Sequence, residues 1–144
     1  MFKLDTWVSY VAANNMKRLT EVFGQRLEIK GVTRIQWIAL YYLGVKGDMQ
    51  QNELASYMDI KDSTVARLLD RMERDQLVLR TKDKDDRRVT IVSLTEKGMK
   101  YREVLMPEGQ IFSDEILLGI TDEELEIFNN VMNKMLNNVK KIDE

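Results

Sequence analysis

The 144-residue chain contains no cysteine and no histidine, and these two absences exclude whole classes of function. Without cysteine there is no disulfide, no thiolate nucleophile and no thiol redox chemistry. Without either residue there is no zinc site built on imidazole or thiolate, and no serine–histidine triad. Acid–base enzymes that use Asp, Glu, Lys or Tyr remain open, but the chain has no P-loop and no metal–carboxylate motif. An enzyme is therefore the least favoured function, and we expect no metal and no cofactor.

Proline, glycine and long apolar runs are also scarce. One proline and seven glycines in 144 residues favour a mostly helical chain. No apolar run reaches the ~20 residues that a membrane helix needs, and the N-terminus lacks the apolar core of a secretion signal. We therefore expect one mainly helical, cytoplasmic domain over residues 1–144, with no membrane partner.

The net charge of −2 conceals an uneven distribution of charge along the chain. Residues 61–90 carry nine basic and seven acidic groups, and residues 91–102 carry three and one. Residues 103–144 carry three basic and ten acidic groups. A polyanion would therefore meet the middle of the chain and be repelled by its acidic end.

Hydrophobic periodicity predicts two helices in the first third of the chain. The first, with apolar residues at helical spacing from Leu4, should end near Gly24 or a little beyond. The second should begin at Thr33, with Gln36 completing a capping box, and end at the Gly44–Gly47 stretch. Its apolar face is predicted to contain four residues: Trp37, Ile38, Tyr41 and Tyr42.

A helix-turn-helix followed by a hairpin is predicted for the middle of the chain. Residues 51–59 form a short third helix, and residues 62–75 form a fourth with a clean amphipathic stripe. The apolar period then changes from 3.6 to 2, which predicts a hairpin of residues 77–82 and 89–94 with a charged tip. The stripe of the fourth helix consists of Val65, Leu68, Leu69 and Met72.

Two further helices complete the chain. Thr95 predicts the start of the fifth helix, which Pro107 should bend or interrupt. Thr121 and Glu124 predict a capping box for the last helix. This helix carries an a/d seam of nearly three heptads, which we interpret as a homodimer interface; packing against the first helix is the alternative, and both can hold. The seam comprises Leu125, Phe128, Met132, Met135, Val139 and Ile142.

This order of elements is that of a winged helix-turn-helix protein. Such a helix fits the DNA major groove with its first turns at the base edges, and a hairpin with a cationic tip can reach the neighbouring backbone or minor groove. Alone, the polar face of the fourth helix is more typical of an ordinary solvated surface, but the hairpin behind it favours double-stranded DNA as a partner. Arg67 is the candidate for guanine, and Arg71 and Arg74 suit phosphate. The predicted DNA contacts are Ser63, Thr64, Arg67, Arg71, Arg74, Lys84, Arg87 and Arg88.

Several runs of residues carry a resemblance to a known family. They are Leu54-Ala55, Ser63 to Glu73, Leu77-Val78-Leu79-Arg80, Asp86-Arg87-Arg88 and Leu94-Thr95-Glu96-Lys97-Gly98. Together they resemble the MarR family of transcriptional regulators, and the flanking helices extend the resemblance over essentially the whole chain.

The resemblance implies a homodimeric winged-helix protein, here expected to be a ligand-responsive repressor, that binds a pseudo-palindromic operator. The fourth helix enters the major groove and a wing arginine enters the minor groove. The winged lobe is expected at about residues 33–98, and the dimerisation helices at about residues 1–25 and 108–144. The alternative is a winged-helix protein-interaction module without DNA binding.

Two arginines take the wing position. Strand alternation should point Arg87 and Arg88 to opposite sides, so one enters the groove while the other pairs with Asp86 or phosphate. The sequence leaves open which does which.

Three residues depart from the family pattern. Gln76 stands where glycine is usual after the recognition helix, and a left-handed C-cap there would cost about 1 kcal/mol. Lys61 stands where a serine N-cap is common, so capping should fall to Asp59 or Asp62. Lys84 replaces a frequent wing proline.

The resemblance also implies a small-molecule effector in a cleft between the dimerisation helices and the winged lobe. An aromatic cleft with one cation suits an aromatic or anionic molecule, and Arg18 is the candidate anchor. Alternatively, each of these aromatic residues is simply part of the core. The candidate wall residues are Trp7, Tyr10, Asn14, Arg18, Trp37, Tyr41 and Tyr101.

Overall fold

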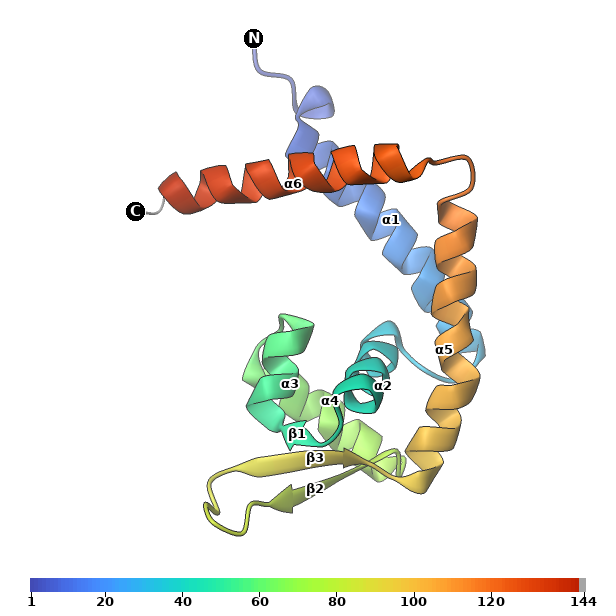
Figure 1. Ribbon diagram of the computed structural model, residues 1–144, viewed down its shortest axis with the longest axis vertical. Helices are drawn as coiled ribbons and strands as arrows, with labels where there is room; N and C mark the ends of the chain where they lie inside the picture. The colour runs from blue at the N-terminus through green and yellow to red at the C-terminus, as the bar shows by residue number, and fades with distance from the viewer. Residues whose placement is uncertain (143–144) are drawn as a thin grey trace. The chain divides into compact units, whose positions relative to one another are not determined.

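The computed structural model describes residues 1–142, which form two compact units, one of residues 1–110 and one that begins at Ile111. Helices dominate both, and a small antiparallel sheet lies in the first (Figure 1). This architecture confirms the fold class predicted from the sequence. In chain order the elements are η1 (Leu4–Thr6), α1 (Val8–Ile29), α2 (Arg34–Lys46), β1 (Met49–Gln50), α3 (Gln51–Met58), α4 (Asp62–Arg74), β2 (Val78–Lys82), β3 (Thr90–Leu94), α5 (Glu96–Ile116) and α6 (Asp122–Ile142).

The core of the first unit forms where α2, α3 and α4 pack on one another and on the sheet. Leu40 of α2 and Leu54 of α3 are fully buried. Full burial of such a side chain contributes roughly 1.5–3 kcal/mol, so the inner face of α4 is firmly held and its opposite face is left to solvent. As predicted, the buried residues of α4 are Val65, Leu68, Leu69 and Met72.

The sheet contains the predicted hairpin and one strand that the sequence did not reveal. β2 and β3 pair antiparallel with Arg80 opposite Val92, close to the expected bounds. β1 joins the outer side of β3, which gives the order β1-β3-β2 and places Met49 opposite Val92. A strand of two residues has no alternation to detect, so only its pairing identifies it.

Three helices begin at the predicted caps. The Thr33 hydroxyl accepts the Gln36 N–H at 3.2 Å, and the Gln36 side chain accepts the Thr33 N–H at 3.0 Å. The same reciprocal pair joins Thr121 and Glu124 at 2.8 and 3.2 Å. Thr95 Oγ1 accepts the N–H three residues further on at 2.9 Å. These bonds satisfy amides that the first turn of a helix leaves without helical partners.

Two helices differ from their predicted courses. α1 is preceded by a separate 3₁₀ turn at Leu4 and runs through Gly24 to Ile29, so one interior glycine does not end a helix of 22 residues. α5 continues through Pro107 without interruption. Pro107 and Glu103 are both exposed, so water can bond the Glu103 carbonyl that the proline leaves without an N–H donor.

The inner face of α2 is not the one predicted. None of the four predicted residues is buried, and Tyr41 is 42% exposed. Because α2 is apolar on nearly every side, periodicity alone cannot select its inner face. The buried residues of α2 are Gln36, Ala39, Leu40 and Leu43. No helix within residues 1–142 is long and apolar enough to cross a membrane.

Candidate nucleic-acid interface

The turn between α3 and α4 presents the outer face of α4 to solvent. Asp59 adopts a left-handed conformation with φ 52°, which ends α3 after Met58. Neither Asp59 nor Asp62 caps α4 as expected; Lys61 is the N-cap residue, and its side chain makes no cap hydrogen bond. The residues predicted for the outer face of α4 are all exposed: Ser63, Thr64, Arg67, Arg71 and Arg74.

The last turn of α4 ends in the predicted left-handed conformation. Gln76 has φ 62°, and its N–H donates to the Glu73 carbonyl at 2.9 Å. The Leu77 N–H donates to the Met72 carbonyl at 2.9 Å. This pair of bonds is a Schellman motif, which normally uses glycine at the left-handed position. Gln76 therefore carries a strain of about 1 kcal/mol that the rest of the turn must offset.

The start of α5 holds this turn in place. Thr95 Oγ1 donates to the Gln76 carbonyl at 2.6 Å, and Lys97 Nζ donates to the Asp75 carbonyl at 2.8 Å. The Thr95 N–H donates to the Leu77 carbonyl at 3.1 Å. A Cβ at Gly98 would collide with the same Leu77 carbonyl, so only glycine permits this approach. The run from Leu94 to Gly98 thus fixes the C-terminal end of α4 against α5.

Arg80 ties the outer face of α4 to strand β2. Its Nη2 donates to Asp70 Oδ1 at 2.6 Å, and its Nε donates to Glu73 Oε2 at 3.1 Å. The Arg80 backbone N–H also donates to Glu73 Oε2, at 3.1 Å. Desolvation lowers the pKa of Arg80, but the bonds to the two carboxylates outweigh it, so the pKa is raised overall. Arg80 therefore stays charged and links the helix to the root of the hairpin.

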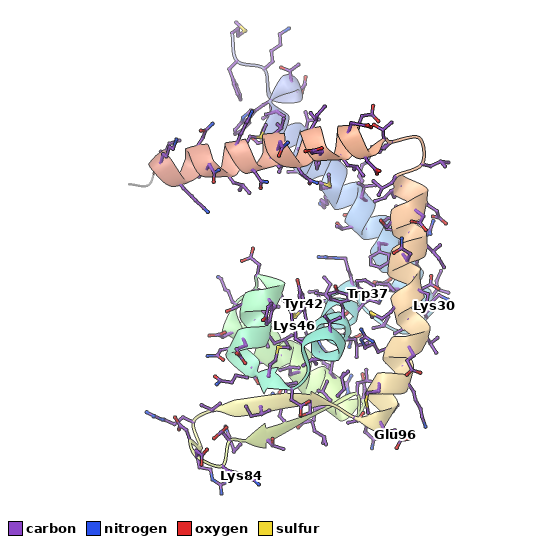
Figure 2. The ribbon with its side chains drawn as sticks, in the orientation of Figure 1. Lys30, Trp37, Tyr42, Lys46, Lys84 and Glu96 are labelled. Atoms are coloured by element: carbon purple, nitrogen blue, oxygen red, sulfur yellow. The ribbon has the colours of Figure 1, made fainter. Side chains whose placement is uncertain are left out.

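The tip of the β2–β3 hairpin is organised by Asp83. Its Oδ1 accepts the N–H groups of Asp85 and Asp86 at 2.8 and 3.1 Å. Lys84 lies at this end of the hairpin (Figure 2). Residues 87–88 form a turn before β3 begins at Thr90, so the strand alternation expected to separate the two arginines does not apply.

Asp86 holds Arg88 in one orientation. Arg88 Nε donates to Oδ1 at 3.0 Å, and Arg88 Nη2 donates to Oδ2 at 3.1 Å. Nevertheless, the Arg88 side chain is 90% exposed. The side-chain bonds from Arg88, followed by the bond from its backbone N–H, lower the pKa of Asp86, and the same pairing raises the pKa of Arg88.

A polar cavity of about 230 Å³ lies where the helix-turn-helix meets the hairpin. Arg88 contributes to it from the hairpin, and Asp62 from the first turn of α4. The start of α3 contributes Gln51 and Asn52, which sequence reasoning missed because single amide residues at a helix start have no distinctive pattern. The lining consists of Gln50, Gln51, Asn52, Asp62, Arg88, Val89 and Thr90.

A second cavity, of about 280 Å³, lies between α2 and α5 within the first unit. Trp37 and Tyr41 form its aromatic wall, with ring centroids 6.3 Å apart. Trp37 is fixed by a bond from Nε1 to the Leu105 carbonyl at 2.8 Å. A Cβ at Gly109 would collide with the Trp37 ring, so this glycine keeps the space open. The lining consists of Trp37, Tyr41, Arg102, Met106, Gly109 and Gln110.

The cation in this second cavity is Arg102, which the sequence did not single out. Its Nε donates to the Leu40 carbonyl at 3.1 Å. Its side chain crosses α2 at Gly44, where a Cβ would collide with the guanidinium group. Donor and acceptor are 62 positions apart in the chain, so no local pattern could have paired them.

The other residues predicted for an effector cleft lie elsewhere in the first unit. Tyr101 donates its hydroxyl to the Lys30 carbonyl at 2.8 Å and borders a different hollow with Lys97 and Lys100. Trp7 packs edge-on against Phe2, with centroids 5.5 Å apart. The remaining three are exposed along α1: Tyr10, Asn14 and Arg18.

The a/d seam of α6 contributes no buried residue to the second unit. Leu125, Met132 and Met135 are half-buried, and Ile142 is 80% exposed. No described residue of α6 is buried. An amphipathic helix with an open apolar stripe needs a partner surface to cover it.

Comparison with known proteins identifies the family. The model of the MarR family matches residues 32–90. The HTH-type transcriptional regulator YsmB of Bacillus subtilis is 33% identical over 138 residues, which cover 96% of this chain and 92% of that protein. The chain belongs to the MarR family.

Other members share both sequence and fold with this MarR-family protein. The HTH-type transcriptional repressor MdtR of Bacillus subtilis is 36% identical over 102 residues, which cover 70% of this chain and 65% of that protein. The crystal structure of the S. aureus MepR–DNA complex has a TM-score of 0.82 and 27% identity, and covers 90% of this chain and 96% of that one.

Membership in the MarR family decides between the function classes left open by the sequence. The protein is a DNA-binding transcriptional regulator with a winged helix, and its family is not one of enzymes. Gln76 and Lys61, where the chain departs from the usual residues of the MarR family, alter only the caps at the two ends of α4 and leave the fold the same. Gln76 adopts the expected backbone conformation, and Lys61 leaves the first turn of α4 without a side-chain cap.

Proposed function

We propose that this MarR-family protein is a ligand-responsive repressor that binds a pseudo-palindromic operator as a homodimer. The observation that carries the DNA-binding part is the joint geometry of α4 and the wing. The polar face of α4 is exposed to solvent, and Arg88 extends beside it while held by Asp86. A helix and a cationic ribbon presented together match a major groove and the backbone or minor groove next to it.

The residues of α4 divide into two roles along the helix. Ser63, Thr64 and Arg67 lie in the first half, which reaches base edges in this docking mode, and Arg67 suits the bidentate pattern of guanine. Arg71 and Arg74 lie in the last turns and contact phosphate. Arg74 Nε also pairs with Asp75 Oδ1 at 3.2 Å, so the Asp75 carboxylate partly neutralises the positive charge that Arg74 offers to phosphate.

Arg88 is proposed as the minor-groove residue, with Arg87 and Lys84 on the phosphate backbone. The sequence suggested that the arginine paired with Asp86 would remain outside the groove. The 90% exposure of the Arg88 side chain favours the reverse assignment. A guanidinium already fixed by Asp86 loses less conformational entropy on insertion than a free one, and narrow A·T-rich minor grooves attract such a cation.

Gln51 and Asn52 are proposed to contact a phosphodiester group that passes over the polar cavity between α3 and the wing. Their amide groups can donate hydrogen bonds to phosphate oxygens. These contacts position the protein along the duplex without reading its sequence.

Homodimerisation is proposed through α1 and α6. The open seam of α6 supplies the apolar surface, and a two-fold dimer places two copies of α4 at successive major grooves about 34–36 Å apart. This assigns residues 33–98 to the winged lobe and residues 1–25 and 108–144 to dimerisation. Such a dimer would repress by occupying promoter DNA, and the name of the relative MdtR records that it is a transcriptional repressor.

The effector is proposed to be a small aromatic anion bound in the cavity between α2 and α5. Trp37 and Tyr41 offer ring faces, and Arg102 offers the charge that Arg18 was expected to supply. A ligand that competes for the Arg102 guanidinium would disturb its bond to Leu40. Release of DNA then requires that the ligand bind one conformation of the dimer better than the other.

Selection of bound fragments from the source genome tests the proposal. We expect a common pseudo-palindromic sequence, bound by two chains per duplex with an affinity that falls steeply with salt. A scrambled duplex of equal composition serves as the control. Equal affinity for the selected and scrambled duplexes would contradict an operator-specific regulator.

A further inference from the structure

The outer face of α4 carries acidic side chains among the arginines that are proposed to contact DNA. The helix contains three arginines and three carboxylates, so it carries no net charge of its own. Asp70 follows Arg67 by three residues and precedes Arg74 by four, which places it on the same stripe as two proposed DNA contacts. Its side chain is 65% exposed. An unpaired carboxylate at this point would face the phosphates of the duplex.

Arg80 is placed to neutralise these acidic side chains. Its side chain extends from β2 to two carboxylates of α4. Nη2 lies 2.6 Å from Asp70 Oδ1, near the centre of the helix, and Nε lies 3.1 Å from Glu73 Oε2, near its end. Its own side chain is only 22% exposed, so its donors are directed at the helix and not at solvent. One guanidinium fork thus serves two acids, which a lysine ammonium cannot do with the same geometry.

The same residue fixes the root of the wing. Arg80 lies opposite Val92 in the β2–β3 ladder, and Val92 is fully buried. The third bond, from the Arg80 backbone N–H to Glu73, attaches the strand itself to α4. The distance between α4 and the wing arginine is therefore fixed through Arg80.

We propose that Arg80 is the positioning residue of the DNA-binding surface. It neutralises Asp70 and Glu73 on α4 and sets the spacing of helix and wing, without contacting DNA itself. This inference rests on the proposed placement of α4 in the major groove. It means that operator affinity depends on a residue that faces away from the duplex, and that its loss can be compensated by removing the charges it neutralises.

Charge-rescue variants test this role. Arg80→Gln should weaken operator binding by about tenfold or more at 0.1 M salt, because two carboxylates then face phosphates. Asp70→Asn with Glu73→Gln should stay within about threefold of the natural protein. Adding Arg80→Gln to that pair should cost no more than about threefold further. The measurement is fluorescence anisotropy with the selected operator over a range of salt concentrations.

Lys82→Gln is the matched control. It removes one positive charge from the same strand, at a side chain that bonds Thr90 Oγ1 at 3.1 Å and not the acids of α4. A loss equal to that of Arg80→Gln would show that only the general charge of β2 matters and would overturn the proposal. Failure of the triple variant to recover affinity would also overturn it, since Arg80 would then contact DNA directly.

Thermal unfolding of each variant separates positioning from a purely structural role. In a purely structural role, Arg80→Gln lowers the unfolding midpoint while the folded protein binds normally, and that result overturns the proposal. If Arg80→Gln does not fold, Arg80→Lys replaces it; one ammonium cannot bond both acids with the same geometry, so a smaller loss is expected, and adding Asp70→Asn should recover it. Arg67→Ala tests the placement of α4 separately, because an unchanged operator affinity together with an unchanged selected sequence contradicts the placement whatever Arg80 does.

Discussion

Asp86 accepts three hydrogen bonds from Arg88, two from the guanidinium and one from the backbone N–H at 3.0 Å, yet it leaves that guanidinium in solvent. The carboxylate therefore orients the arginine without covering it. A charged side chain that is ordered and exposed at once is ready to bind a partner of opposite charge. On the wing of a DNA-binding regulator, the partner that we propose is the duplex.

The two wing arginines should respond differently to removal. Arg88→Ala should weaken operator binding and abolish the preference for A·T pairs at the position of the wing, because minor-groove width is read by an inserted cation. Arg87→Ala should lower the slope of log affinity against log salt by about 0.9 per lost phosphate contact, with sequence preference intact. Selection from a randomised operator library with each variant distinguishes them, and the opposite pattern would assign the groove to Arg87.

Operator binding should be almost independent of pH between about 5 and 8. The chain has no histidine, and the pKa of Asp86 lies below its ordinary value of 3.8. A lowered carboxylate pKa means that the Asp86–Arg88 pair is intact above that ordinary value and is lost only as pH falls through the lowered one. Anisotropy titrations across this pH range at constant ionic strength check it. A change of tenfold within the range would contradict this prediction.

Arg67→Ala should cost roughly 1–3 kcal/mol per half-site and relax the choice of particular base pairs. Arg71→Ala is the control on the same helix, since loss of a phosphate contact should weaken all sequences alike. Binding of both variants to the operator and to single-base variants of it is the measurement. If Arg67→Ala weakens every sequence equally, Arg67 contacts phosphate instead of a base.

The parts of this protein that local patterns determine could be predicted from the sequence, and those set by distant contacts could not. The stripe from Val65 to Met72 fixed the inner face of α4, and Thr33 fixed the start of α2. The pairing of Asp86 with one of the two wing arginines was one of the alternatives that the sequence offered, because the partners are neighbours in the chain, but the sequence did not say which arginine it would be. By contrast, the Arg102 side chain is positioned by its hydrogen bond to the Leu40 carbonyl, 62 residues away in the chain. Strand β1 is identified only by its pairing with β3.

Dimerisation should depend on the half-buried methionines of α6. Met132→Asp or Met135→Asp places a carboxylate in the proposed seam, where burial without a partner is costly, and should shift the protein toward monomer or unfolded chain. Asn133→Asp adds the same charge at an exposed position of the same helix and should leave the dimer intact. Sedimentation at micromolar concentration should give twice the chain mass for the natural protein and the control. A monomeric natural protein would contradict both the dimer and the palindromic operator.

Small aromatic acids should bind beside Trp37 and release the operator. In a Trp7→Phe background, Trp37 is the only tryptophan, so titration with a panel that begins with 4-hydroxybenzoate reports on this cavity through its fluorescence. Arg102→Gln should abolish both the fluorescence change and the release of operator DNA, because it removes the cation that pairs with the carboxylate.

Two further variants serve as controls. Met106→Trp should block ligand binding by filling the cavity while it keeps Arg102, and it is measured by operator release alone. This variant separates loss of the ligand site from a purely structural effect of losing the Arg102–Leu40 bond. Arg18→Ala is the control, since Arg18 lies exposed on α1 and should leave the response unchanged. Retention of the response in Arg102→Gln, together with its loss in Arg18→Ala, would place the effector at α1 instead.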